Sequence, residues 1–357
     1  MTRQLALDAS HRESADAFSI VWNHRLPAGF NREPAEEYAA VRGAVGLFDQ
    51  SYRGVLDLVG DSVDGFLQRL VSTHATGLSR RSGQESALLS ARGRLLGAFQ
   101  LHRVGEERFR MVLGEPLRDG IVSALRKYAF LDDIELDDRE QELAVLALAG
   151  PRSVDALDGG RLPGERLERV ASSLADVDVE IVRASETDED GFEIWAPRAQ
   201  VEAVWAALLG RVERLGGLRV GWRAAESLRV EAGLTRYEID YDDDGFPSEV
   251  NHGHRLTYDK CYVGQEVVAR MQTYGHVNRK AFHLAPDGES ELASGERIVA
   301  GDDDAGHVTS VCDAFRAHAP RGIGMVHRKY WESGELCTER GTRIALSELP
   351  EQKGIAR

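Results

Sequence analysis

The chain has 357 residues, 42% hydrophobic and 29% charged, which is typical of a globular protein too long for one hydrophobic core. The net charge of −15 argues against nucleic acid as a partner, because an acidic surface repels a phosphate backbone. Apolar runs such as residues 143–150 are too short to span a membrane, and residues 1–19 lack the apolar core of a secretory signal. We therefore expect a cytoplasmic protein without membrane contact.

Helices and strands alternate along the first half of the chain. The expected elements are a helix over residues 34–42, a strand over 53–59, a helix over 61–71, a hairpin over 95–104 and 109–113, and a helix over 116–130. The helices show apolar residues three and four positions apart, and the strands are rich in β-branched residues. Pro34 suits a first helical turn, and Asp61 suits a helix N-cap.

The second half repeats this alternation and then changes character. Strands are expected over residues 143–149, 180–184 and 192–196, and helices over 153–157, 201–209 and 222–232. Interleaved helices and hairpins favour an α+β fold. After Arg279 the chain carries short apolar pieces separated by Gly, Asp and Pro turns, which indicates a small all-β domain. We therefore predict domains over residues 1–279 and 280–357.

The sharpest local motif runs from Lys260 through Cys261 to Glu266 and precedes a helix-like segment. A neighbouring lysine and a helix N-terminus both stabilise a thiolate, so Cys261 is a candidate nucleophile, redox centre or metal ligand. A cysteine that only packs beneath the turn is an equally good interpretation. The three cysteines are widely spaced without a C-x-x-C pair, which argues against a disulfide framework and a cysteine-rich metal site.

Two acidic segments have competing interpretations. Glu193 lies on a predicted strand, on the opposite face from its neighbours, where a carboxylate could accept paired hydrogen bonds from an aminopyrimidine edge. A solvent-facing glutamate is the commoner arrangement. Residues 240–245 resemble the start of an EF-hand loop, but Asn251 stands where that loop needs a glutamate, so we interpret them as a solvated turn and predict no metal site.

Several ordered segments resemble the aminomethyltransferase (glycine-cleavage T-protein) superfamily from Tyr38 to the C-terminus. They are residues 46–51, 60–61 with 66–70, 89–93, 190–193 and 227–233. The resemblance implies a ring of two α+β parts and a C-terminal β-barrel-like domain around a folate pocket. It also implies that Glu193 holds the pterin and that tetrahydrofolate or a one-carbon derivative is the cofactor. Arg223, Arg229 and Tyr262 are the further ligand-binding candidates.

Within this superfamily, the motif around Cys261 is similar to the K-G-C-Y-x-G-Q-E signature of the YgfZ proteins, which bind folate and support iron–sulfur enzymes. The matching residues are Lys260, Cys261, Tyr262, Gly264, Gln265 and Glu266, with no glycine between Lys260 and Cys261. The T-proteins carry paired aspartates in the strand after residues 92–93, one of them essential. Here Gly97 and Ala98 hold those places.

The primary hypothesis is therefore a YgfZ-type tetrahydrofolate-binding protein with Cys261 as its reactive residue and iron–sulfur client or assembly proteins as partners. The alternative is a folate-dependent aminomethyltransferase or demethylase acting on a small amine. It would need a substitute acid or base, for which Asp49, His102 and Tyr262 are the candidates. A third hypothesis is a scaffold with a vestigial pocket. Whether the protein is an enzyme stays open at this stage.

Overall fold

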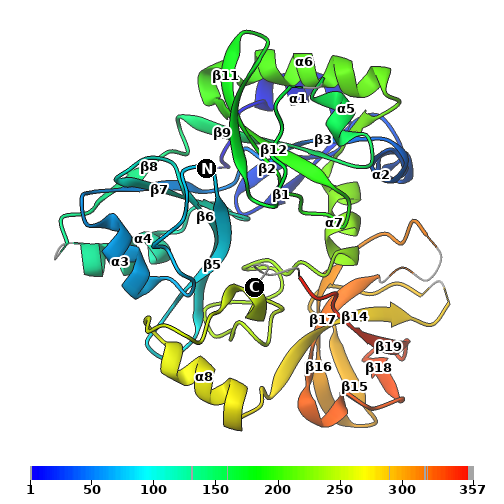
Figure 1. Ribbon diagram of the computed structural model, residues 1–357. Helices are drawn as coiled ribbons and strands as arrows, with labels where there is room; N and C mark the ends of the chain where they lie inside the picture. Colours follow the sequence, from blue (N-terminus) through cyan, green and yellow to red (C-terminus); the bar gives the residue numbers. More distant parts are fainter. Residues whose placement is uncertain are drawn as a thin grey trace.

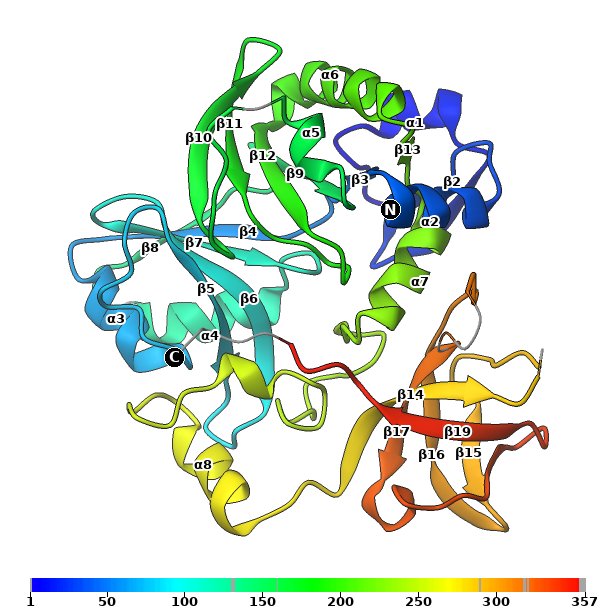
Figure 2. The same ribbon diagram turned by 45° about the vertical axis from the view of Figure 1, so that its right-hand side comes forward.

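The computed structural model describes residues 2–129, 132–158, 160–288, 290–316, 319 and 321–352, apart from the side chain of Tyr274. Figures 1 and 2 show three lobes: two built on β-sheets with helices, and a barrel made of the C-terminal strands. The segment between the last helix of the second lobe and the barrel runs between the lobes. The fold mixes helices with largely antiparallel sheets, as the sequence predicted.

The first lobe is a five-stranded antiparallel sheet in the order β5-β6-β7-β4-β8. Its strands are β4 (Val55–Val59), β5 (Gly83–Leu89), β6 (Leu95–Arg103), β7 (Arg108–Leu113) and β8 (Glu135–Asp138). Helices α3 (Val63–Leu70) and α4 (Asp119–Ala129) pack on one face through a buried core that includes Phe66 and Leu125. The predicted helix over 116–130 starts later than expected, and Phe130 lies outside the described residues.

The second lobe is a six-stranded sheet in the order β10-β11-β12-β9-β3-β13. Its strands are β3 (Gly46–Asp49), β9 (Leu143–Ala149), β10 (Arg169–Leu174), β11 (Val177–Val182), β12 (Gly191–Pro197) and β13 (Leu218–Arg219). The first lobe is thus inserted between β3 and β9, so the two sheet lobes interleave along the chain. Helix α6 (Val201–Arg214) covers the face that carries Phe192 and Ile194, because alternate strand residues point to opposite faces.

Shorter elements complete the second lobe. They are α1 (Asp8–Ser14), the hairpin of β1 (Ala17–Val21) and β2 (His24–Gly29), α2 (Pro34–Gly43), α5 (Ser153–Ala156), η1 (Arg198–Gln200) and α7 (Trp222–Glu231). Helices α2 and α7 pack together with Phe48 and Ala147 on the sheet face away from α6. This face points toward the other lobes and therefore frames the candidate site.

The third lobe is a closed barrel in the order β14-β17-β16-β15-β18-β19. Its elements are β14 (Arg279–Pro286), β15 (Arg297–Ala300), β16 (Asp303–Val311), β17 (Gly322–His327), η3 (Arg328–Tyr330), β18 (Leu336–Thr338) and β19 (Arg343–Glu348). The all-β character expected after Arg279 is present in this lobe, although the three-residue β18 was not anticipated as a strand. The barrel interior is apolar, with Leu284, Ile298 and Val308 almost fully buried.

Residues 232–264 connect α7 to α8 (Gln265–Tyr274) and contain the short η2 (Gly253–Arg255). Backbone hydrogen bonds tie this segment to two lobes: Leu95 N donates to Gly245 O at 2.9 Å, and Ala281 N donates to Glu249 O at 2.8 Å. The connection is therefore held in place by the first sheet and by the barrel, so it can form part of a preorganised site.

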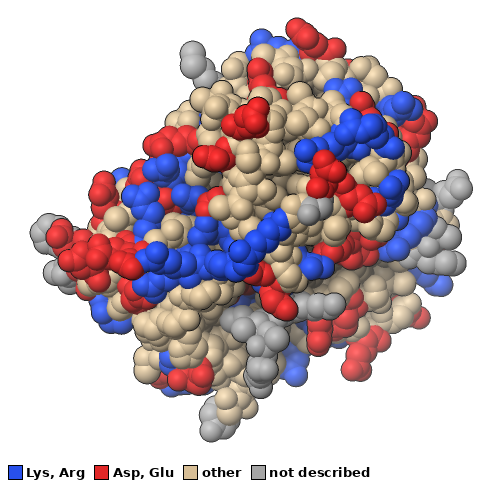
Figure 3. All heavy atoms as spheres, turned by 45° about the horizontal axis from the view of Figure 1, so that its top comes forward, with Lys and Arg blue, Asp and Glu red and all other residues tan. Residues whose placement is uncertain are grey.

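Among the described helices, none combines the length and apolarity needed to cross a membrane. Basic and acidic side chains lie next to one another over the face shown in Figure 3.

Candidate functional site

A polar cavity lies where the first sheet, the β11–β12 turn and the connecting segment meet; its space, including the part open to solvent, is about 670 Å³. Its wall includes Arg53, Ala98, Gln100, Glu115, Glu186, Arg236, Tyr241 and Arg255. An adjoining, more apolar hollow of about 640 Å³ shares Glu186 and Arg236 with it.

Glu193 lies behind the cavity wall and accepts hydrogen bonds from two residues that line it. Its Oε1 atom accepts hydrogen bonds from Arg53 Nη1 at 2.7 Å and Gln100 Nε2 at 2.6 Å, and its Oε2 accepts one from Trp195 Nε1 at 3.1 Å. The glutamate is 1% exposed, so the solvent-facing alternative is wrong. The sequence analysis expected a ligand to donate hydrogen bonds to the Glu193 carboxylate. In the structure the guanidinium of Arg53 donates one of them. Neither Arg53 nor Gln100 was singled out from the sequence, because both are remote along the chain.

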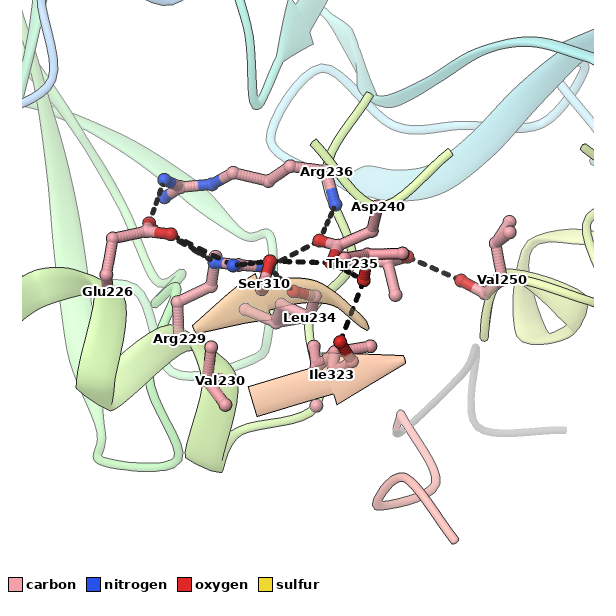
Figure 4. Close-up of polar contacts among 12 residues, drawn as sticks. Glu226, Arg229, Val230, Leu234, Thr235, Arg236, Asp240, Val250, Ser310 and Ile323 are labelled. Carbon is pink, nitrogen blue, oxygen red and sulfur yellow. Dashed lines mark hydrogen bonds and ion pairs between the residues drawn. The ribbon is translucent and has the colours of Figure 1, made fainter. Parts of the chain in front are cut away.

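Arg229 lies in a fully buried network, shown in Figure 4. Its guanidinium donates to Glu226 Oε2 at 2.9 Å, Asp240 Oδ2 at 2.7 Å and Ser310 Oγ at 2.6 Å, with a further bond to Leu234 O. All its donors are thereby engaged within the protein. These bonds join α7, the connecting segment and β16, which gives Arg229 a structural role. Arg229 also lines the cavity, so its contact with a ligand stays a prediction.

Asp240 is the centre of the same network. Its Oδ1 atom accepts hydrogen bonds from Thr309 Oγ1 at 2.7 Å and Ser310 Oγ at 2.6 Å, and its Oδ2 accepts one from Arg236 N at 2.9 Å. The interpretation of residues 240–245 as a solvated turn is therefore wrong at its first residue, which is 4% exposed. Burial and pairing hold the connecting segment against the barrel.

Arg236 links this network to the cavity. Its Nη1 atom donates to Glu226 Oε1 at 2.5 Å, and its Nη2 donates to Glu186 Oε2 at 2.9 Å. Arg223, in contrast, lies on the outer side of α7, where it pairs with Asp313 at 2.9 Å and its side chain is 55% exposed. It lines a separate surface groove with Cys312, so a contact between Arg223 and a cavity ligand stays a prediction.

The acid expected in an aminomethyltransferase is absent from β6. Ala98 lines the cavity, and a Cβ built on Gly97 would instead meet Ile121 of α4 at 2.9 Å. Of the suggested substitutes, His102 is fully buried, and burial lowers its pKa to about 3. Asp49 is paired with His11 at 2.8 Å and lines only the apolar hollow. His102 is therefore unsuited to accept and release protons near neutral pH.

Glu115, a carboxyl of the cavity wall that the sequence analysis did not single out, lies two residues after the end of β7. It is 4% exposed, and among the described residues no group donates a hydrogen bond to its Oε1 atom. Burial raises the pKa of Glu115 to about 7, against the opposing effect of Arg118. In the sequence, Glu115 is recognisable only as a glutamate next to Pro116 after a buried strand, and this pattern is also common on protein surfaces.

The motif around Cys261 lies before α8, and Cys261 is exposed. Gly264 has φ 83°, and a Cβ there would meet Ser90 O at 2.4 Å, so glycine is needed for the turn to dock on the 90–93 loop. Lys260 Nζ donates to Thr73 O at 2.7 Å, and burial lowers the pKa of this amine to about 8. The motif therefore presents its thiol at the surface.

The other members of the motif divide between core and surface. Tyr262 is 7% exposed and packs in the cluster with Ala98 and Tyr241, and burial raises the pKa of its phenol. Gln265 and Glu266 start α8, where Glu266 pairs with Arg270 on the surface at 2.9 Å. Within the described part of the chain, no group of three or more His, Cys, Asp or Glu side chains could hold a metal ion.

The fold and the site define a mixed α/β protein whose lobes meet at a polar cavity. The chain matches the GCVT N-terminal domain over residues 7–260, and it belongs to that family. Proteins of this family use tetrahydrofolate as their one-carbon carrier. The superfamily expected from the sequence is therefore confirmed.

Comparison with individual proteins extends the similarity over the whole chain. It is 27% identical to an aminomethyltransferase of Stenotrophomonas maltophilia, covering 97% of this chain and 94% of the relative. An aminomethyltransferase of Thermus thermophilus is 29% identical, with 88% and 89% covered. The crystal structure of glycine cleavage system aminomethyltransferase T from Bartonella henselae superposes with a TM-score of 0.83 and 26% identity, covering 98% and 97%. These relatives do not single out the YgfZ branch, and they favour the aminomethyltransferase alternative.

Proposed function

We propose that this chain binds a reduced folate in the central cavity and performs folate-dependent one-carbon transfer of the aminomethyltransferase type. The observation that carries this proposal is the end-to-end similarity to aminomethyltransferase T, combined with a polar cavity where the first sheet, the β11–β12 turn and the connecting segment meet. In this proposal the sheet lobes and the barrel form the ring around the folate pocket that the sequence resemblance implied, in a cytoplasmic protein.

The chemistry of the cavity wall suits a reduced folate. A pterin edge presents planar N–H donors and a carbonyl acceptor, and the ligand's tail carries carboxylates. The amide of Gln100 and the guanidinium groups of Arg236 and Arg255 offer matching partners in the wall. When bound, the carrier supplies the nitrogen that accepts the one-carbon unit.

Glu193 has two possible roles in such a site. In the role predicted from the sequence, it contacts the pterin directly, and Arg53 must then leave the carboxylate. In the other role, Glu193 orients Arg53 and Gln100, and these two side chains face the ligand. The second role agrees with the burial of Glu193 and with its three existing hydrogen bonds.

Calorimetric titration with tetrahydrofolate tests the site. Glu193→Ala should weaken binding by about 1.5–3 kcal/mol, the contribution of a hydrogen bond to a charged group. Glu213→Ala, at an exposed position on α6, is the matched control and should bind like the wild type. Arg53→Gln separates the roles: it should weaken binding if Arg53 faces the ligand, and strengthen it if Arg53 competes with the pterin for Glu193. Unchanged affinity in Glu193→Ala would contradict both roles.

Transfer itself is tested with an aminomethylated lipoyl carrier protein and tetrahydrofolate, by following the loss of the aminomethyl group from the carrier. Wild-type protein should accelerate this loss only when tetrahydrofolate is present. A protein that binds no reduced folate and leaves the carrier unchanged would refute the proposed function and favour a scaffold.

A second candidate function, of the YgfZ type, is favoured by one observation. The motif from Lys260 to Glu266 places Cys261 at the surface and away from the cavity lining, where a partner protein can reach the thiol. If this function holds, Cys261→Ala should retain tetrahydrofolate binding but fail to support an iron–sulfur enzyme in cells that lack the natural protein. Full support by Cys261→Ala would contradict it.

A further inference from the structure

The cavity holds a carboxyl close to the β6 positions from which the expected acid is missing. Strands β6 and β7 pair with Phe99 opposite Leu113, so the chain two residues beyond Leu113 runs beside Gly97. The backbone of Glu115 is fixed there, because Gly54 N donates to Glu115 O at 2.9 Å. Glu115 and Ala98 line the same cavity, Ala98 from β6 and Glu115 from the chain that follows β7.

The Glu115 carboxyl differs from the other buried carboxylates of this region in having no close donor. Glu193 accepts three hydrogen bonds, and Glu85 is contacted by Arg166 at 2.9 Å, Arg255 at 3.0 Å and His254 at 3.2 Å. The nearest cation to Glu115 is Arg118, with Nη2 3.9 Å from Oε1, and Arg118 Nη2 already donates to Leu96 O.

Other charged and titratable groups surround Glu115 from every side of the cavity. They are Arg118 on the chain after β7, Glu186 on the β11–β12 turn, and Arg236, Tyr241 and Arg255 on the connecting segment. The charge of Glu186 disfavours an ionised Glu115, and Arg118, Arg236 and Arg255 favour it. Burial outweighs this balance and raises the pKa of Glu115 to about 7.

A buried carboxyl without a hydrogen-bond donor destabilises a fold, so its presence in a cavity wall points to a ligand. We propose that Glu115 is the acid–base residue of this cavity, and that it exchanges a proton with the amine that delivers or accepts the one-carbon unit. This inference rests on the proposed function. It gives Glu115 the acid–base role for which the sequence offered Asp49, His102 and Tyr262 as candidates.

The proton balance of the reaction fits one carboxyl. Transfer forms an N–C bond at the accepting nitrogen and breaks the bond between the one-carbon unit and its previous atom. The Glu115 carboxylate accepts the proton released from the attacking N–H group, and the resulting carboxyl gives a proton to the departing atom. No net oxidation occurs, and Glu115 returns to its starting state.

The experiment compares wild-type protein with Glu115→Gln, with the double variant Glu115→Gln/Ala98→Asp, and with Glu213→Gln as an exposed control. Tetrahydrofolate affinity of Glu115→Gln should stay within about threefold of wild type, because glutamine keeps the shape of the side chain. The rate of aminomethyl transfer should fall about 100-fold or more, the usual effect of losing a general acid–base group. The double variant should recover part of this rate, because the Ala98→Asp substitution would place a carboxyl in the same cavity.

A binding readout tests the same residue without turnover. Titration of tetrahydrofolate in buffers with different ionisation enthalpies measures the protons taken up or released on binding. Wild-type protein should exchange a pH-dependent fraction of a proton near pH 7, and Glu115→Gln should lose that component. A purely structural role would move neither this proton count nor the transfer rate.

The outcomes separate the two proposals. If the wild-type protein transfers the aminomethyl group and Glu115→Gln transfers it equally fast with equal proton exchange, the role of Glu115 is overturned. The proposed function then still stands. Wild-type protein that neither binds nor transfers overturns the proposed function and, with it, this role. If Glu115→Gln alone misfolds, the Glu115→Asp variant decides, because its carboxyl is one methylene shorter and no longer reaches the same point. A wild-type transfer rate in Glu115→Asp would contradict the assignment.

Discussion

Replacing Glu115 with Gln should stabilise the folded protein, and the gain should depend on pH. The ordinary pKa of a glutamate is 4.5, and burial raises the pKa of Glu115 to about 7. Each pKa unit corresponds to about 1.4 kcal/mol, so keeping Glu115 ionised above pH 7 costs the folded state about 3 kcal/mol. Glutamine has no charge to desolvate, and it retains the size of the protonated side chain.

The sign follows from proton binding. Between about pH 4.5 and pH 7 the folded state binds more protons at Glu115 than the unfolded state, so wild-type stability falls as pH rises through this window. The Glu115→Gln protein has no carboxyl at this position, so its unfolding free energy does not fall for this reason. The difference in unfolding free energy should therefore be small at pH 4.5 and should reach its full value, on the order of 3 kcal/mol, by about pH 8.

Urea unfolding of both proteins at several pH values, at one fixed ionic strength, measures this difference. Other titrating groups contribute equally to both proteins and cancel in the comparison. Glu213→Gln, on the surface of α6, is the control and should show no comparable trend. A variant no more stable than wild type at pH 8, or a gain of the same size at every pH, would refute the argument that Glu115 is a desolvated acid.

Two further predictions concern the connecting segment and the thiols. Asp240→Asn should reduce the unfolding free energy by about 3 kcal/mol, because it removes a charge that neutralises the buried Arg229; equal stability of this variant and the exposed control Asp302→Asn in urea would contradict that. At pH 7 a maleimide should label Cys261 while Cys312 stays unlabelled until the protein unfolds, because burial raises the pKa of Cys312 to about 12. Equal labelling of both peptides in the folded protein, read by mass spectrometry, would show that this contrast is wrong.

Local sequence patterns located most of the elements because periodicity and turn chemistry are properties of short segments. The strand predicted over residues 143–149 is β9, and the helix expected from Pro34 begins at that residue as α2. The same reasoning missed β18, which is only three residues long and therefore has no alternation to detect. The motif before α8 was also readable, because Gly264 and the helix that follows are local features.

Roles that depend on a distant partner were harder to assign. Arg229 has the sequence position of a ligand-binding side chain, yet Asp240 and Ser310 take its donors, and Ser310 lies 81 residues further along the chain. Glu193 was correctly placed on a strand facing the interior. Its partner Arg53 is 140 residues away in sequence, so no local pattern could show that the carboxylate was already paired.

The sequence by itself determined the elements, the superfamily, the loss of the β6 acid at Gly97 and Ala98, and the motif around Cys261. Only the tertiary structure decided which side chains meet in the cavity and in what protonation state. Burial and the approach of charges from separate lobes set those properties, and both arise after the chain has folded. Glu115 is an ordinary glutamate in the sequence, and it becomes an acid with a pKa of about 7 because the first sheet and the connecting segment together remove water from it.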